Sequence, residues 1–286
     1  MPTREVLLLA LIGRIAGCAE RRPIPAACNG AIALCDRRYD QVAYPTAHNA
    51  MSHEDGFWVA PNQDHGLSRQ LADGVRALML DTHEYRGEAY LCHEICPLGS
   101  QRLVDGLDEI RRFLDSNRGE VLSVIFESYL GAAATRAAFA RSGLDRYLAT
   151  LPSDGTFPTL RELIASDRRL VVFTDKEGGA FPGYHDLWKY AWETPFSVEQ
   201  AADFGCRHNR GAAGGPLLIL NHFLSAPLAS RSLARLANAA PSLLEHARAC
   251  GRRPSFVAVD FYATGDLFAA VRALNNLAVE KDLPIR

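Results

Sequence analysis

The sequence VLSVIFE at residues 121–127 decides the fold that we predict for this chain. It is apolar except for Ser123 and the terminal Glu127. A nearly continuous apolar run is typical of a parallel strand whose sheet is covered on both faces. Similar runs follow at residues 169–174 (RLVVFT), 217–221 (LLILN) and 256–260 (FVAVD). We therefore predict a buried, mostly parallel sheet.

Helices are predicted between these strands, because apolar residues recur there at helical spacing. Earlier strands are predicted at residues 41–45, 76–81 and 89–93. Helices are predicted at 68–73, 103–117, 133–149, 159–166, 227–250 and from Leu267 to Leu277, and residues 178–195 are predicted to be a loop. This alternation predicts an α/β fold, a distorted TIM (β/α) barrel in a single domain. A doubly wound sheet is the alternative, but no glycine-rich phosphate fingerprint follows an early strand.

The composition is that of a folded globular protein. Hydrophobic residues make up 48% of the 286 residues, which is ordinary for a globular chain. The formal net charge is -2 and no basic run is present. We therefore expect no nucleic-acid partner, and we expect a monomer.

The amino terminus resembles an export signal. Arg4 precedes the apolar run VLLLALI at 6–12, which is too short to span a bilayer. The following IAGC resembles the bacterial lipobox, whose cysteine, here Cys18, is lipidated and begins the mature chain. We expect an exported protein that is either extracellular or anchored to a membrane as a lipoprotein through Cys18; a plain amino-terminal helix of a cytosolic protein is the alternative. The predicted organisation is a signal peptide at 1–18, a tether at 19–27 and the folded domain at 28–286.

The cysteine count agrees with export. Six cysteines remain after Cys18, and an even number in an exported chain predicts disulfides. Sequence proximity favours the pairs Cys28–Cys35 and Cys92–Cys96, which leaves Cys206–Cys250. Metal ligation by Cys92, His93 and Cys96 is the alternative, although this spacing matches no standard zinc pattern.

Polar and ionisable groups stand where the predicted strands end, which is where a TIM barrel carries its active site. The groups are His48-Asn49, Asp81-Thr82-His83, His93, Glu127, Thr174-Asp175, Asn221-His222 and Asp260. Each one alone could be a helix cap or a solvated loop residue. Together they predict a reaction site at this end of the barrel.

The residue types at these positions predict chemistry at phosphorus. His48 and His93 can share acid–base work, in which one removes a proton and the other donates one. Asn49, Asp81 and Glu127 offer oxygen ligands of the kind that Ca²⁺ prefers. A cation together with an acid–base pair suits displacement at phosphorus, because charge builds on the non-bridging oxygens.

The chain resembles the phosphatidylinositol-specific phospholipase C X-domain family. The motifs that carry the resemblance are TAHNAM at 46–51, GVRALMLD at 74–81, YLCH at 90–93 and VIFE at 124–127. A narrower resemblance is to an exported bacterial and fungal branch of PLC-like phosphodiesterases, in CNG at 28–30 through CD at 35–36, WETP at 192–195 and VDFY at 259–262. The resemblance covers residues 28–278 in order and implies a distorted TIM barrel that cleaves phosphodiesters, with inositol lipids as the prototype substrate.

The resemblance also implies residue roles. His48 would be the general base and His93 the general acid, Asp260 would orient His48, and Asn49, Asp81 and Glu127 would match calcium ligands. For substrate binding, we predict His83, Lys176 and Asn221 near the same rim. The chain departs from the metal-dependent pattern at Met79, where an acid is usual, and at Glu94, where glycine is usual, so Ca²⁺ should bind weakly. Metal-independent members have arginine at the position of Asp81.

We therefore expect a phospholipase C-like phosphodiesterase that acts on a phospholipid or a small phosphodiester and contacts a membrane surface. Hydrolysis of a soluble glycerophosphodiester is an alternative. A binding module that kept the barrel and lost turnover is another, favoured by Met79 and Glu94.

Overall fold

The computed structural model describes residues 25–152, 155–225 and 228–277. The predicted signal peptide, Cys18 and most of the predicted tether lie outside these residues. No described helix has the length and apolar character that a membrane span requires.

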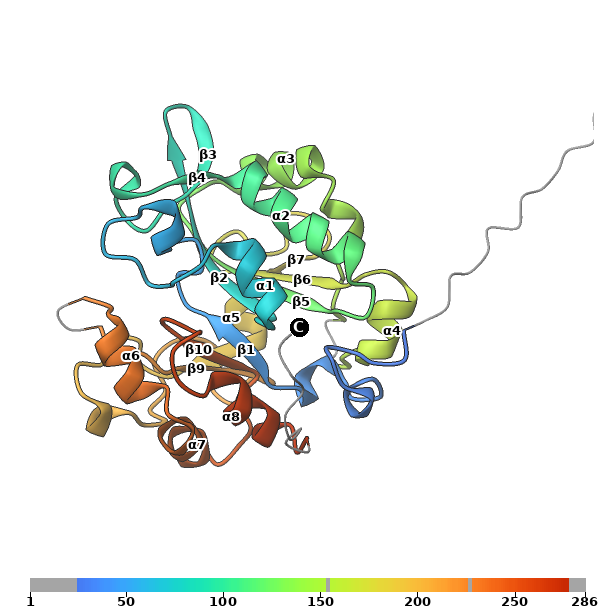
Figure 1. Cartoon of the computed structure of the whole chain (residues 1–286). Helices are drawn as coiled ribbons and strands as arrows, with labels where there is room; N and C mark the ends of the chain where they lie inside the picture. Colours follow the sequence, from blue (N-terminus) through green and yellow to red (C-terminus); the bar gives the residue numbers. More distant parts are fainter. Residues whose placement is uncertain (1–24, 153–154, 226–227, 278–286) are drawn as a thin grey trace, which may run out of the picture.

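The described chain forms one mostly parallel sheet (Figure 1). The strands are β1 (Tyr44–Ala47), β2 (Ala77–Tyr85), β3 (Glu88–Leu91), β4 (Gln101–Arg102), β5 (Leu122–Ser128), β6 (Leu170–Thr174), β7 (Tyr184–Asp186), β8 (Ala191–Glu193), β9 (Leu217–Asn221) and β10 (Phe256–Val259). The order β7-β6-β5-β2-β1-β10-β9-β8 is parallel throughout. This path confirms the predicted TIM-type α/β fold. The buried strand β5, all of whose residues except Glu127 are buried, lies between β2 and β6 as its apolar sequence predicts.

The barrel is distorted because its two end strands do not pair with each other. Within the described residues, β7 pairs only with β6, and β8 pairs with β9 on its inner side. Both β7 and β8 lie in residues 178–195, which the sequence predicts to be a loop. That prediction is wrong: this stretch also contains helix α5 (Leu187–Tyr190), and it supplies the barrel strands that the sequence leaves unassigned.

Seven other α-helices surround the sheet within the described residues. They are α1 (Leu67–Asp73), α2 (Leu103–Ser116), α3 (Ala132–Ser142), α4 (Leu160–Ala165), α6 (Arg231–Ala237), α7 (Ala240–Ala249) and α8 (Leu267–Leu274). Helices α1, α2 and α3 lie beside β2 and β5, whereas α6, α7 and α8 lie beside β9 and β10 (Figure 1). Two predicted helices are shorter than expected. Gly143, at φ +68°, ends α3, and the predicted 227–250 helix is broken after Ala237 before α7 begins with Pro241 in its first turn.

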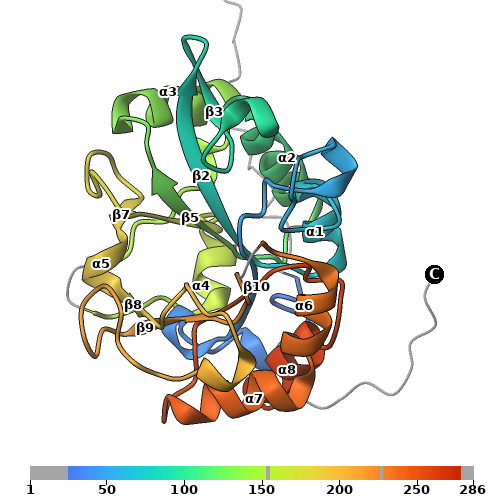
Figure 2. The same ribbon diagram turned by 90° about the vertical axis from the view of Figure 1, so that its left-hand side faces the viewer.

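The strand predicted at 89–93 is confirmed as β3, but its expected place among the barrel strands is wrong. β3 instead pairs antiparallel with the outer part of β2, so the two form a hairpin that projects beyond the sheet (Figure 2). The turn at Arg86-Gly87 has positive φ at both residues, 54° and 76°, which is the geometry of a tight hairpin turn. The hairpin returns the chain toward the barrel end, and residues 92–100 follow there.

The three predicted disulfides are present. They join Cys28 to Cys35, Cys92 to Cys96 and Cys206 to Cys250. Because Cys92 and Cys96 are bonded to each other, they are not metal ligands, and that alternative is excluded. The Cys92–Cys96 bond closes a short loop that contains His93 and Glu94, so it restricts the backbone on which the predicted acid lies.

Candidate active site

Four predicted site residues lie at the carboxyl ends of neighbouring parallel strands. His48 follows β1 and Asp260 follows β10, and Ala47 at the end of β1 pairs with Val259 at the end of β10. Asp81 on β2 is the register partner of Glu127 on β5. This arrangement follows from the fold, because parallel strands bring their carboxyl ends to one edge of the barrel.

His48 is held in one orientation by three contacts. Its Nδ1 lies 2.8 Å from Oδ1 of Asp260, and its ring stacks on Phe223 with centroids 3.8 Å apart. Asn62 Nδ2 donates to the same Asp260 oxygen at 3.1 Å, and Gln63 Nε2 donates to the carbonyl of His48 at 2.6 Å. With Nδ1 donating to Asp260, the other ring nitrogen, Nε2, carries the lone pair that a general base needs.

His93 approaches the same site from the disulfide-closed loop. Its Nε2 lies 3.3 Å from Asn49 Nδ2, so in this orientation of the amide Asn49 donates and His93 accepts. Burial and the neighbouring His48 lower the pKa of His93, and Glu94, Asp260 and Glu127 oppose this shift only in part. The carboxylates alone would favour a raised pKa; desolvation outweighs them because His93 lies mostly out of water.

The two histidines share a cavity at the barrel end. This outer cavity has a volume of about 370 Å³, and its lining includes His48, His93 and Asp260. A smaller inner cavity of about 40 Å³ lies deeper in the barrel. Four residues, His48, Asn49, Asp81 and Glu127, line both cavities, so the predicted base and the predicted cation ligands adjoin one space.

Carboxylates dominate the charge of this space. Burial raises the pKa of Asp81 well above its usual value, and the nearby Glu127, Asp175 and Glu94 raise it further. Glu127 accepts a hydrogen bond from the Tyr129 hydroxyl, and this bond is the largest cause of the raised pKa of Tyr129. Negative groups this close to one another attract a cation or a positively charged side chain.

The predicted substrate-binding residues lie outside the lining of both cavities. His83 stacks on Tyr129 with centroids 4.5 Å apart, and its Nε2 is buried without a hydrogen bond within the described structure. Lys176 donates to the Ser128 carbonyl at 2.9 Å and lies over the Tyr129 ring. Asn221 is buried and donates to the Thr194 carbonyl at 2.8 Å. The three side chains therefore contact other protein groups and line neither cavity.

Residue His222, also at a predicted strand end, does not reach the site. It is fully buried, with Nδ1 2.8 Å from Nδ1 of His246 and Nε2 2.8 Å from the Ala237 carbonyl. Burial lowers its pKa to about 3, so it is a neutral structural residue at physiological pH.

Five residues of the site were not predicted from the sequence. They are Asn62, Gln63, Glu193, Arg210 and Phe223. Glu193 lies in the WETP motif, which carries part of the family resemblance but has no function predicted from the sequence. The others lie in loops whose position depends on long-range packing.

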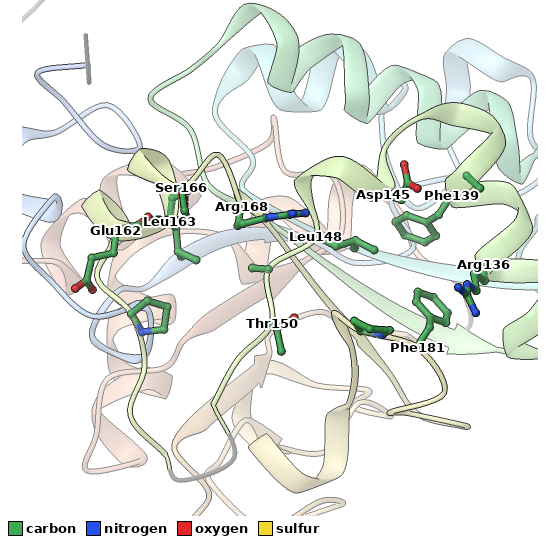
Figure 3. A pocket seen from close by; sticks show the side chains of 14 residues that line it. Arg136, Phe139, Asp145, Leu148, Thr150, Glu162, Leu163, Ser166, Arg168 and Phe181 are labelled. Carbon is green, nitrogen blue, oxygen red and sulfur yellow. Dashed lines mark hydrogen bonds between the residues drawn. The ribbon is translucent and has the colours of Figure 1, made fainter. Parts of the chain in front are cut away.

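A cavity of about 780 Å³ lies elsewhere on the molecule, and it shares no lining residue with the two cavities of the candidate site. Figure 3 shows its lining, with Phe139, Leu148 and Phe181 beside the charged residues Arg136 and Arg168. Size alone therefore does not locate the candidate active site. The paired histidines and the carboxylates do, because they can perform acid–base chemistry.

Comparison with known proteins identifies the family of this barrel. The family model described as PI-PLC X 1 matches residues 34–275. The chain belongs to the PI-PLC X-domain family. This match spans every strand of the sheet and all of the site residues described above.

Relatives within the PI-PLC X-domain family include fungal and plant proteins. The chain is 32% identical over 275 residues to a PI-PLC X domain-containing protein 1 of Arthroderma benhamiae, covering 87% of this chain and 90% of that protein. It is 29% identical over 296 residues to a protein of the same fungus described as an uncharacterized secreted protein, covering 90% of this chain and 66% of that protein. It is 28% identical over 261 residues to an Arabidopsis thaliana PI-PLC X domain-containing protein, covering 80% of this chain and 59% of that protein.

A solved structure has the same fold. Phosphatidylinositol-specific phospholipase C from Staphylococcus aureus superposes with a TM-score of 0.57 over 85% of this chain and 94% of that one. The identity is 13%, so this likeness concerns the fold alone.

The cation that the resemblance implies fits the donor set in part. Asn49, Asp81 and Glu127 offer hard oxygen donors, and all three line both cavities of the candidate site. The described residues hold no cluster of three His, Cys, Asp or Glu side chains that could ligate a metal. Met79, at the position where the resemblance predicts an acid, lines the inner cavity. The donor set of the described residues therefore lacks the acidic ligand that the resemblance predicts at position 79.

Proposed function

We propose that this chain is a phosphodiesterase of the phospholipase C type, acting on an inositol phospholipid or a related phosphodiester. The observation that carries the proposal is the pair His48 and His93 facing one cavity, with His48 hydrogen-bonded to the buried Asp260. Two imidazoles with unequal surroundings can divide base and acid roles. The family and the fold support the same reaction class.

The reaction begins with a hydroxyl of the substrate. His48 Nε2 removes its proton while the oxygen attacks phosphorus. Asp260 stabilises the resulting imidazolium through the 2.8 Å bond to Nδ1. The bond from phosphorus to the leaving alcohol then breaks, and protonated His93 donates a proton to that alcohol. A 2-hydroxyl of inositol would give a cyclic phosphate and diacylglycerol, whereas water would give an ordinary hydrolysis product.

Asn49, Asp81 and Glu127 would hold a Ca²⁺ ion, with an affinity limited by Met79. When bound, such an ion neutralises charge on the non-bridging phosphate oxygens. The Asn49 side chain could then keep its Nδ2 contact with His93 while its amide oxygen binds the ion. Otherwise this contact with His93 would have to break. The Asn49 backbone, at φ +44°, is fixed in a left-handed turn that directs the amide toward this space.

An exposed apolar surface beside the site supports a membrane-borne substrate. We call it the apolar rim; it consists of Phe57, Val59, Ile95 and Leu98, whose relative exposures are 94%, 61%, 53% and 46%. The Val59 N–H donates to the Leu98 carbonyl at 2.8 Å, so the two loops lie side by side. Ile95 follows His93 and Glu94 within one disulfide-closed loop, which places the rim next to the catalytic cavity. We propose that this rim contacts the lipid surface.

Export is also part of the proposal. The three disulfides form readily only in an oxidising compartment, and a fungal relative is described as secreted. Anchoring as a lipoprotein through Cys18 rests on the sequence alone.

A panel of phosphodiesters tests the proposed reaction. Phosphatidylinositol, glycerophosphoinositol, glycerophosphocholine and sphingomyelin should be assayed with Ca²⁺ and with EDTA, with His48→Ala as the inactive control. We expect cleavage of phosphatidylinositol, stimulated by Ca²⁺ and lost in the control. Cleavage of only the soluble glycerophosphodiesters would point to a glycerophosphodiester hydrolase. Binding without turnover of any of them would point to a binding module.

Vesicle binding tests the apolar rim. Phe57→Ser combined with Ile95→Ser should reduce co-sedimentation with phosphatidylcholine vesicles by at least about tenfold, because two exposed apolar side chains are lost. Leu236→Ser is the matched control, since Leu236 is 68% exposed on α6 and is not part of the rim. Equal binding by the two variants would exclude the rim as the contact surface.

A further inference from the structure

The open edge of the barrel is covered by a loop of the chain itself. The Glu193 N–H donates to the Arg210 carbonyl, and the Asn209 N–H donates to the Glu193 carbonyl, both at 3.0 Å. These bonds place residues 209–211 along the side of β8 that no barrel strand pairs. Gly211 is required there: its φ is +94°, and a Cβ would lie 2.2 Å from the Ala191 carbonyl oxygen. The loop therefore lies along the open edge of the barrel at β8.

This loop brings Arg210 to the reaction site. Arg210 lines the inner cavity together with His48, Asn49, Asp81 and Glu127. Its Nε donates to Glu193 Oε1 at 2.5 Å, and its guanidinium stacks over Trp188 and Phe196 at 4.9 and 4.7 Å. The Nη1 and Nη2 groups have no hydrogen-bond partner within the described residues. A guanidinium that is fixed through Nε and by two aromatic rings keeps these donors pre-organised.

The Glu193 carboxylate, which binds this guanidinium, is held in a fixed position. Its side chain is only 2% exposed. Its oxygens also accept from Asn209 at 2.9 Å and from Asn221 at 3.2 Å, so the carboxylate cannot rotate freely. The contact between Glu193 and Arg210 gives the WETP motif a structural role. Asn221 contributes by donating a hydrogen bond to the Glu193 carboxylate. A buried carboxylate requires such partners to remain charged.

Among the described residues that line the two cavities, Arg210 is the only lysine or arginine. The same lining contains six carboxylates: Asp81, Glu94, Glu127, Asp175, Glu193 and Asp260. A phosphodiester is an anion, so this surface repels it unless a positive group meets it. Lys176, predicted from the sequence for this task, lies outside both linings.

We propose that Arg210 binds an anionic phosphate oxygen of the substrate and that Glu193 is the positioning residue that orients it. This inference rests on the proposed phosphodiesterase function and names a residue of the same site. The inner cavity, about 40 Å³, is too small for a head-group ring, so the head group occupies the outer cavity and only a small oxygen group reaches toward Arg210. A planar guanidinium with two free N–H groups matches a phosphate better than a lysine does.

The test measures phosphate binding without turnover. Methyl phosphate is titrated into the full-length protein in EDTA, and its dissociation constant is measured by NMR. Arg210→Gln should weaken binding at least tenfold, and Arg210→Lys should recover only part of it. Lys176→Gln is the matched control, because it removes one positive charge near the site but outside the cavities; it should change the constant by less than about threefold.

Folding is controlled with a double variant. Arg210→Gln alone leaves Glu193 buried without its cation, so it can fail to fold. Glu193→Gln with Arg210→Gln removes both charges, and its thermal unfolding should resemble that of the unmodified protein. If this folded double variant binds methyl phosphate as tightly as the unmodified protein, Arg210 only neutralises Glu193 and the proposal is overturned. The same conclusion follows if Lys176→Gln weakens binding as much as Arg210→Gln does.

A kinetic measurement separates this inference from the proposed function. His48→Ala should lose turnover and still bind methyl phosphate normally. If the unmodified protein turns over no substrate in any assay but its phosphate binding depends on Arg210, the proposed phosphodiesterase function is refuted. The proposed anion-binding role of Arg210 then still stands. With an active substrate, Arg210→Gln should raise KM at least tenfold; an unchanged KM in a folded variant would refute the contact with substrate.

Discussion

Removal of His93 gives the most direct test of the proposed division of labour. His93→Ala removes the acid that protonates the leaving alcohol, and His48→Ala removes the base that activates the nucleophile. Each change should lower kcat/KM on a natural lipid by about 10²–10⁴-fold, as general acid–base groups do. A nitrophenyl phosphodiester needs no acid, because nitrophenolate leaves unprotonated. This substrate should therefore restore much of the activity of His93→Ala and none of that of His48→Ala.

The pH at which this loss is measured changes its size, and the structure gives the direction. Burial and His48 lower the pKa of His93 below 6.5. A lowered pKa means that a smaller fraction of molecules carries the protonated imidazole at neutral pH than for an ordinary histidine. At pH 7, therefore, only part of the unmodified protein has His93 in the protonated form that can donate a proton. The fold-loss caused by His93→Ala should therefore grow as pH falls from 7 toward 5.

The assay compares both variants with both substrates across pH 5–8, with circular dichroism to confirm folding. The unmodified protein should lose kcat/KM on the lipid as pH rises above the lowered pKa of His93, and this alkaline limb should disappear in His93→Ala. Equal rescue of the two variants by the nitrophenyl ester, or rescue of neither, would refute the assignment of base and acid. An alkaline limb that survives in His93→Ala would assign that titration to another group.

Other expected outcomes concern metal, cysteines and the barrel edge. Ca²⁺ affinity should be weak and should increase with pH, because the raised pKa of Asp81 keeps this ligand protonated at lower pH; Asp81→Asn should abolish the pH dependence in a calorimetric titration. Protein from an oxidising host should show no reactive thiol among its six paired cysteines after denaturation, and two or more would contradict the disulfides. Gly211→Ala should lower the free energy of unfolding by about 2–4 kcal/mol in a urea titration, since its Cβ meets the Ala191 carbonyl; a loss below about 0.5 kcal/mol would show that the loop adjusts.

The sequence predicted the central strands because their signals are local. The apolar runs that became β5, β6, β9 and β10 are each long enough to indicate a buried strand. The strands β7 and β8 have three residues each and lie among Trp, Gly and Pro, so no periodic pattern distinguishes them from a loop. They form because the edges of β6 and β9 offer unpaired hydrogen-bonding groups. This is a tertiary effect that a short window does not contain.

The structure brings His93 to the candidate site by a different route from the one predicted from the sequence. Its position after an apolar run suggested the end of a barrel strand. The run is instead the returning strand of a hairpin, and the loop after it carries His93 back to the site. The residue type and its neighbours were sufficient to select it, whereas its support depends on pairing between β2 and β3. Its pKa direction was also beyond the sequence, because the balance of burial against carboxylates depends on distances.

The charge of the site connects the catalytic proposal with the unpredicted arginine. In the proposed reaction a phosphodiester approaches a surface that contains Asp81 and Glu127, so the proposed site needs positive charge before chemistry can begin. Two sources of positive charge were predicted from the sequence. One is a cation with an incomplete ligand set, and the other is Lys176, which lies outside the cavities. The structure offers Arg210, carried on a glycine-bounded loop that exists because the barrel is open at β8. The distortion of the barrel is therefore part of the proposed site: a closed β7–β8 pair would occupy the edge along which Arg210 enters.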